Sequence, residues 1–306
     1  MRLHRQDEVP GDEQGLLCRQ SRLAGIMKLI VWRGILAVFP FFGWKLGEPW
    51  LFWIGIALAA IVIPITTLDL AAMFRATNWL VRISREGLWI NLRSYRDRNM
   101  SPDTLTVVRL GYREIARVGQ HKEKYTTPSD IARRGTPPGT AATGTSTHWR
   151  DTYLEIELTH DQTEELKVAL NDVRFPTPPA DAPSVKTRAT VRIPTVWLVN
   201  PSLLRITWLS SHGPVIAPRL AQVLSLLETY VNVAPPTRRE RPNWRKMTLE
   251  ESIDLARELV HVHGATIEAT ALVSRACGLS HCEASAQVQQ LQFEEMESLA
   301  STQPGK

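Results

Sequence analysis

Residues 50–68 form an uninterrupted apolar run, which constrains the fold of this chain more than any other stretch. The run reads WLFWIGIALAAIVIPITTL and contains no charged side chain. About 20 apolar residues in a helix are enough to cross the hydrocarbon core of a bilayer. We therefore predict a transmembrane helix here. A buried helix in the core of a soluble protein is the alternative interpretation.

A second apolar run, residues 29–46, lies just before the first and is interrupted by Arg33 and Pro40. The connection between the runs is the short segment 47–49. Two apolar runs with a tight connector predict a helical hairpin, and we assign residues 27–76 to it. A single arginine in such a helix can extend toward the headgroups.

Basic residues flank both ends of the hairpin, whereas the turn carries Lys45 balanced by Glu48. Positive flanks stay on the cytoplasmic side of a membrane, and tryptophan favours the membrane–water interface. The chain is therefore predicted to be multi-pass, with both termini and the soluble domains in the cytoplasm. The residues expected at the two interfaces are Arg33, Trp44, Trp50, Trp53, Arg75, Trp79, Arg82 and Arg85.

The ends of the chain and its composition add further limits. Residues 1–26 are predicted to be a disordered tail, and Met27 followed by Lys28 offers an alternative start. The three cysteines are too few for a secreted disulfide framework and suit a reducing compartment. The net charge of +5 comes from scattered basic residues, so no nucleic-acid partner is expected.

The segment after the hairpin changes to short β-type runs. Strands are predicted at residues 80–83, 88–92, 105–110, 114–118, 153–158, 166–170, 196–199 and 203–208, followed by an amphipathic helix over 217–231. The segment with Gly87 joins the first two strands as a hairpin. Residues 121–150 and 172–189 are rich in small residues and proline and are predicted to be mobile loops.

This strand order, with RISREGLWI at 82–90, EIARV at 114–118 and a final strand before the helix, resembles the pleckstrin-homology-like domains of bacterial membrane proteins. The resemblance covers residues 77–233. It implies a β-barrel or sandwich capped by one helix, in a protein of the bacterial inner membrane. Such domains look like oligomerisation or adaptor modules. Another small β-barrel or sandwich is the alternative, and phosphoinositide binding is not implied.

Residues 234–246 form a basic, proline-rich linker, and residues 247–298 are predicted to be a small helical domain before a tail at 299–306. Thr248 followed by Glu251 predicts a capping box at a helix start. Gly278 suits the left-handed position that ends a helix, and Ser280 with Glu283 would cap the next one.

The segment 264–291 resembles the helix-turn-helix motif of the ribosomal protein L7/L12 C-terminal domain. The matching residues are Ile267, Ala269, Arg275, Gly278, Leu279, Glu283, Ala284 and Val288. The resemblance implies a protein-binding hairpin, with Ile267, Arg275, Gly278, Leu279 and Glu283 as partner-binding residues. A packed helical bundle without a partner is the alternative.

The expected fold class is an α+β membrane protein, and the expected function is binding. No phosphate loop, nucleophile elbow or paired-acid motif is present, and the His and Cys residues between 261 and 282 match no standard zinc spacing. No enzyme activity, cofactor or metal is therefore predicted. The first hypothesis is a membrane-anchored adaptor or scaffold that binds lipid, an unknown protein or itself. The second is a regulatory subunit of a membrane enzyme or transporter, and an enzyme with a dispersed site is the third.

Overall fold

The computed structural model describes residues 1–9, 15–75, 78–93, 105–128, 146–160, 164–174, 195–210, 215–262 and 265–301. The chain is a mixed α+β protein with two sheets. It divides into a first unit, Met1–Gly111 with Pro214–Val223, and a second unit, Tyr112–Gly213 with Leu224–Lys306. The range 77–233, predicted as one β domain, is thus shared between two units.

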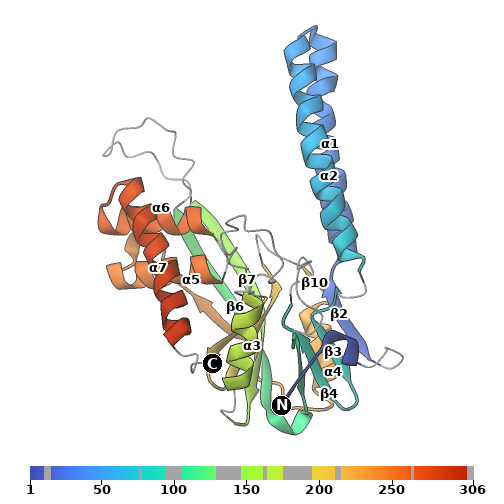
Figure 1. Cartoon of the computed structure of the whole chain (residues 1–306), viewed down its shortest axis with the longest axis vertical. Coiled ribbons are helices and arrows are strands. Elements are labelled where there is room, and N and C mark those ends of the chain that lie inside the picture. The colour runs from blue at the N-terminus through green and yellow to red at the C-terminus, as the bar shows by residue number, and fades with distance from the viewer. Residues whose placement is uncertain are drawn as a thin grey trace. The chain divides into compact units, whose positions relative to one another are not determined.

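Two long helices run side by side in the first unit (Figure 1). They are α1, Arg22–Leu46, and α2, Pro49–Met73. Ser21 caps α1 by accepting a hydrogen bond from the amide of Ala24, and Gly47 ends it with a φ of 68°. Pro49 at the first position of α2 has no amide hydrogen that the helix would leave unpaired. The predicted hairpin of helices is therefore confirmed as local structure.

Only one described helix, α1, is long and apolar enough to cross a membrane by length and composition. The apolar part of α2, Phe52–Leu68, is shorter. Just 7% of the apolar window of α1 is buried within the molecule, so its side chains face outward. This finding supports one crossing, and the second crossing stays a prediction.

The first unit contains a six-stranded antiparallel sheet of order β1–β5–β4–β3–β2–β10. In that order the strands are Arg2–His4, Val107–Leu110, Gly87–Asn91, Val81–Ser84, Leu16–Gln20 and Ile216–Ala217. The prediction of a disordered tail over residues 1–26 is wrong, because β1 and β2 belong to this sheet. These strands are short and partly charged, and only pairing with distant strands makes them extended.

The predicted hairpin around Gly87 is confirmed as β3 and β4, joined through Arg85 and Glu86. Gly87 has a φ of 150°, and a Cβ there would collide with the carbonyl oxygen of Leu110 on β5. Glycine is therefore required where this turn enters the sheet.

The second unit contains a five-stranded sheet of order β11–β6–β7–β9–β8. In that order the strands are Thr237–Glu240, Ile115–Pro128, Ser146–Leu158, Leu203–Leu209 and Val196–Asn200. β11 runs parallel to β6, and the other neighbours are antiparallel. Because β11 and β8 leave two open edges, the sheet is not a closed barrel, and the barrel prediction is wrong.

Three predicted loops and linkers change in the structure. Residues 121–128 and 146–150 extend the β6–β7 hairpin instead of forming a loop, and the rest of the predicted loop, 129–145, lies outside the described residues. The second predicted loop, 172–189, is described only to residue 174, at the end of a helix. The linker 234–246 supplies strand β11 and the short helix Trp244–Lys246.

A predicted strand at 166–170 is wrong, because Glu164–Arg174 forms helix α3. Its buried residues Leu166, Ala169 and Val173 recur at helical spacing, which a five-residue window is too short to reveal. The amphipathic helix predicted over 217–231 is confirmed in its centre as α4, Leu220–Leu227.

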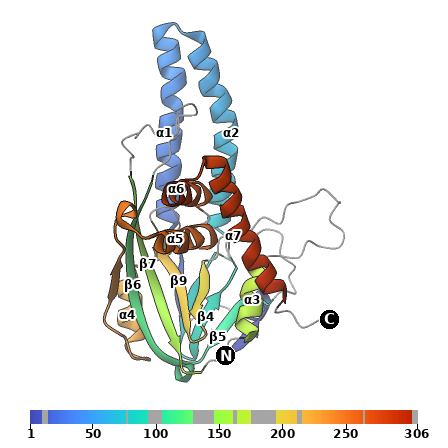
Figure 2. The same cartoon turned by 90° about the vertical axis from the view of Figure 1, so that its left-hand side faces the viewer.

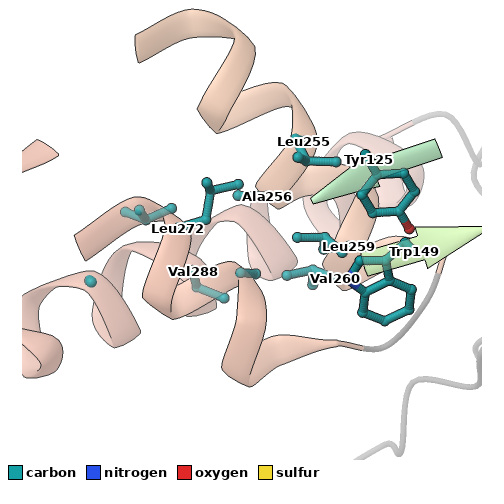
Figure 3. Packing of buried hydrophobic residues seen from close by; sticks show 11 residues of the cluster. Tyr125, Trp149, Leu255, Ala256, Leu259, Val260, Leu272 and Val288 are labelled. Carbon is teal, nitrogen blue, oxygen red and sulfur yellow. The ribbon is translucent and has the colours of Figure 1, made fainter. Parts of the chain in front are cut away.

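Three C-terminal helices pack on the β6–β7 hairpin rather than forming a separate domain. They are α5, Leu249–His261, α6, Thr266–Cys277, and α7, His281–Ser301. Figure 2 shows α5 and α6 beside β6 and β7, and Figure 3 shows Leu255, Leu259 and Val260 of α5 next to Tyr125 and Trp149 of the strands. The two aromatic rings stack at 5.6 Å between centroids.

Candidate functional site

The end of the helical hairpin that carries the α1–α2 turn is rich in exposed tryptophan. Trp44 is 77% exposed, and Trp50 and Trp53 are exposed as well. Nε1 of Trp50 donates a hydrogen bond to the Glu48 carboxylate at 2.9 Å. An indole combines an apolar ring with a polar N–H and so favours a membrane–water interface. The three tryptophans are thus exposed near one end of the hairpin, and their place at a membrane interface stays a prediction.

Arg33, near the middle of α1, contacts α2 through its Nη2, which donates to Oγ1 of Thr67 at 3.3 Å. Thr67 lies 18 residues after Pro49, which is about 27 Å along an α-helix. The hydrocarbon core of a bilayer is about 30 Å thick. The Arg33 guanidinium is thus held near the end of a span that starts at the turn. The side chain of Asp69, two residues after Thr67, lies outside the described residues.

The opposite end of the hairpin, which we call the hairpin base, is defined by Arg19, Arg22, Phe74 and Arg75. Arg22 is the first residue of α1, and its guanidinium lies 4.8 Å from the ring centroid of Phe74. α1 and α2 approach closely here, because a Cβ on Gly25 would collide with the side chain of Met73. The base therefore combines arginines with exposed apolar surface from Phe74.

Three predicted interface residues, Trp79, Arg82 and Arg85, lie elsewhere in the first unit. Trp79 is only 6% exposed and packs with Trp89 and Val107, so its assignment to the interface is corrected. Arg82 places its guanidinium 5.2 Å from the Trp79 ring centroid. Arg85 is exposed in the β3–β4 turn, at the end of β3 that is remote from α2.

Three of the residues predicted to bind a protein partner shape the helical turn after α6. Gly278 ends the helix with a φ of 66°, and Leu279 packs against the C-terminal helical core. Glu283 accepts hydrogen bonds from the Ser280 hydroxyl at 2.7 Å and its amide at 2.9 Å. These hydrogen bonds lower the pKa of Glu283 below its ordinary value. The three residues have structural roles that need no partner.

The other two predicted partner-binding residues lie on α6. Arg275 holds its guanidinium 5.0 Å from the ring centroid of Trp244. Ile267 is 66% exposed, although it is a large apolar side chain in a helix. Of the five predicted residues, Ile267 is thus the one large apolar side chain that is exposed.

A buried ion-pair cluster in the second unit was missed by sequence reasoning. Arg241, just after β11, bonds through Nε to Oε1 of Glu123 at 2.8 Å and through Nη2 to Glu258 of α5. Glu123 is 1% exposed. Burial favours the neutral guanidine, but the charges of Glu258 and Glu123 outweigh it and raise the pKa of Arg241. The cluster connects the sheet to the C-terminal helices.

His121 extends this polar cluster along β6. Its Nδ1 lies 2.8 Å from Oγ1 of Thr237 on β11. Its Nε2, like Oε2 of Glu123, is buried without a hydrogen-bond partner among the described residues. Burial and the Arg205 charge lower the pKa of His121, although Glu155 and Glu123 oppose them. The imidazole is therefore held in its neutral form.

The buried phenols and thiol in the chain are poorly suited to act as bases or nucleophiles. The hydroxyls of Tyr125 and Tyr153 each donate a hydrogen bond to Oδ2 of Asp151 at 3.3 Å. Burial, followed by the Asp151 charge, raises the pKa of both phenols. Burial also raises the pKa of Cys18 to about 12. These groups stay protonated at neutral pH.

The sequence signal for the buried ion-pair cluster is the segment HKEKY at residues 121–125. His121, Glu123 and Tyr125 alternate with Lys122 and Lys124, which is the period of a strand. The small residues that follow led to the prediction of a mobile loop over residues 121–150. The pairing of β6 with β7 shows that the odd-numbered side chains of this segment point inward.

No group of three or more His, Cys, Asp or Glu side chains within the described ranges is placed to hold a metal ion. His261 is buried in α5, whereas His281 and Cys282 are exposed at the start of α7. His263 lies outside the described residues.

Comparisons with protein-family models, curated proteins and solved structures found no match to this chain. The resemblances to pleckstrin-homology-like domains and to the L7/L12 motif therefore stay predictions. What the chain does has to be argued from the hairpin, the sheets and the surfaces described above.

Proposed function

We propose that this chain is a non-enzymatic, membrane-anchored module, whose α1–α2 hairpin crosses a bacterial inner membrane twice and whose two units bind partners in the cytoplasm. The observation that carries the proposal is the outward-facing apolar surface of α1, of which 7% is buried. Such a surface is costly in water and favourable in lipid.

The full length of each helix, although not the shorter apolar part of α2, is what two crossings require. Each helix has 25 residues, which corresponds to about 36 Å between its ends. That length exceeds a hydrocarbon core of about 30 Å. With the tryptophan-rich turn at one interface, Arg33 reaches the other one. The arginine-rich base then faces the cytoplasm, as positive flanks do.

The proposed protein-binding surface is the exposed face of α6 around Ile267. An exposed isoleucine on a helix held in place by a packed core offers an apolar anchor for another molecule. The adaptor role follows from combining this surface with the membrane anchor. Self-association through the same surface is one form that this binding can take.

A regulatory subunit of a membrane enzyme or transporter is the second candidate. Gly55 is buried in the hairpin, whereas Ala57 and Ala60 of α2 are exposed. Small exposed residues on a membrane helix allow another helix to approach closely. This candidate therefore places the partner in the bilayer rather than at α6.

Affinity purification of the full chain from membranes, followed by mass spectrometry, tests these proposals. Ile267→Glu should lose the partner set, whereas Val168→Glu, at a residue of α3 that is 52% exposed, should keep it. Point variants are preferable to truncation after Val233, because truncation would remove α5, which packs on Tyr125 and Trp149.

Each outcome of this purification has a clear reading. Loss of soluble partners from Ile267→Glu alone supports the adaptor. Integral-membrane subunits that remain bound in both variants support the second candidate and contradict recruitment by α6. An absence of specific partners from all three proteins contradicts both candidates.

A further inference from the structure

Three arginines of the first unit come together at the hairpin base. Arg19 lies near the end of β2, two residues before the cap of α1, and Arg22 opens that helix. Arg75 follows Phe74, on whose ring the Arg22 guanidinium lies. Residues from both ends of the hairpin therefore contribute positive charge to one small region.

These three positive charges are not neutralised within the part of the chain that the structure describes. None of the ion pairs there involves Arg19, Arg22 or Arg75. Arg109 of the same sheet, by contrast, pairs with Glu86 at 2.7 Å. The hairpin base thus carries positive charge that no carboxylate among the described residues neutralises.

Arg22 is held in position before any ligand binds. Its guanidinium lies over Phe74, and its Nε is buried with no acceptor among the described residues. A cation–π contact of this kind restrains the side chain while leaving its positive charge in place. The loss of side-chain entropy on binding an anion is correspondingly small.

The depth of the base matches the headgroup layer. If Pro49 marks the outer edge of the hydrocarbon, a core of about 30 Å ends 20 residues later, near Asp69. Met73 then lies about 36 Å from that edge. Since each headgroup layer is about 5–8 Å thick, Arg22 and Arg75 fall within the inner one.

We infer that the hairpin base is a binding surface for anionic phospholipids, in which Arg19, Arg22 and Arg75 attract the headgroup phosphates. Guanidinium groups match phosphate oxygens in charge and geometry. Exposed Phe74 and Leu23 offer apolar contact to the acyl chains beside them. This inference rests on the proposed insertion of the hairpin in a bilayer and deepens it by naming the lipid class.

The test uses the full chain in detergent, titrated with phosphatidylglycerol or with phosphatidylcholine of the same acyl chains. Native mass spectrometry counts the bound lipid and gives the ratio of the two dissociation constants. The wild type should prefer phosphatidylglycerol. The combined Arg19→Gln, Arg22→Gln and Arg75→Gln variant should lose about fivefold of that preference per arginine, because each basic residue near a membrane surface contributes on that scale.

Two further variants separate charge from folding. Replacing the same arginines by lysine keeps the charge and should retain most of the preference. Replacing Arg85, Arg113 and Arg239 by glutamine removes an equal charge elsewhere and should leave the preference unchanged. A glutamine variant at the base that retains the wild-type preference would overturn the inference, as would a lysine variant that loses it.

A flotation assay distinguishes failure of this inference from failure of the proposed insertion. After detergent removal with phosphatidylcholine vesicles, wild type and the glutamine variant should both float, because the apolar hairpin suffices for insertion. If they float but show no preference for phosphatidylglycerol, only the lipid site is wrong. If neither floats, the membrane anchor itself is contradicted, and the lipid site falls with it.

Discussion

At the scale of single residues, the least expected feature is the charge buried between the sheet and the C-terminal helices. Arg241 neutralises Glu123, which has almost no access to water, and also binds Glu258. A buried carboxylate that loses its counter-ion costs far more than an exposed pair that is broken. This difference in stability can be measured by comparing Arg241 with an arginine whose ion pair is exposed.

Replacing Arg241 by methionine should destabilise the second unit by about 3–5 kcal/mol, because it leaves Glu123 buried and unpaired. The matched control is Arg238→Met in β11, whose ion pair with Glu240 is exposed and should contribute no more than about 1 kcal/mol. Urea denaturation of the full chain in detergent, followed by tryptophan fluorescence, measures both. Equal effects of the two changes would contradict the structural role of the cluster.

His121 gives the chain a specific dependence on pH. The folded state lowers its pKa, so the unfolded chain binds more protons once the pH falls below about 6.5. The free energy of unfolding should therefore decrease as the pH is lowered from 7 toward 5. His121→Asn can preserve the contact with Thr237 and should flatten this dependence, whereas replacement of exposed His148 should not. An unchanged slope for His121→Asn would refute the assignment.

At the scale of elements, the C-terminal helices are part of the second unit rather than an appended domain. The inward face of α5 meets the stacked rings of Tyr125 and Trp149, as Figure 3 shows. The capping box of Thr248 and Glu251 fixes where this helix begins. Packing of α5 on the hairpin should then contribute more to stability than any property of the isolated helix.

Two leucines of α5 test this packing. Leu259→Ala removes a fully buried side chain and should cost about 2–5 kcal/mol. Leu249→Ala changes an exposed residue of the first turn and should alter stability by no more than about 0.5 kcal/mol. Thermal unfolding of the two variants measures the difference. Similar midpoints would mean that α5 does not pack on the strands as described.

Elements with local signals were predictable from the sequence, and elements formed by distant pairing were not. The β3–β4 turn, the capping box at Thr248 and the left-handed Gly278 all depend on residues within one turn of each other. β11, in contrast, becomes a strand because Thr237 pairs with His121, more than 100 positions away. Its arginine-rich sequence alone resembles a linker.

The functional surfaces also divide into those that local sequence predicts and those that depend on distant packing. The exposed tryptophans at the turn follow from composition and the known preference of indole for interfaces. The burial of Trp79 and the pairing of Arg241 depend on packing between segments far apart in sequence. Sequence reasoning therefore located the helical hairpin and the tryptophans near its turn but missed the buried ion-pair cluster.

At the scale of the whole molecule, the central claim is that α1 and α2 cross a bilayer and leave both units on one side. The claim is based on the apolar length of α1, on the tryptophans at the turn and on the arginines at the base, which form no ion pair with the described residues. The claim requires the α1–α2 turn and the β3–β4 turn to face opposite aqueous compartments. Each turn carries an exposed charged residue, Glu48 or Arg85, at which a cysteine would be accessible to a labelling reagent.

The most direct test is thiol labelling of single-cysteine variants in intact spheroplasts, in a background with Cys18, Cys277 and Cys282 replaced. A membrane-impermeant maleimide should label Glu48→Cys in intact cells and Arg85→Cys only after the membrane is permeabilised. Labelling of both sites in intact cells, or protection of both until permeabilisation, would contradict a hairpin that crosses the membrane.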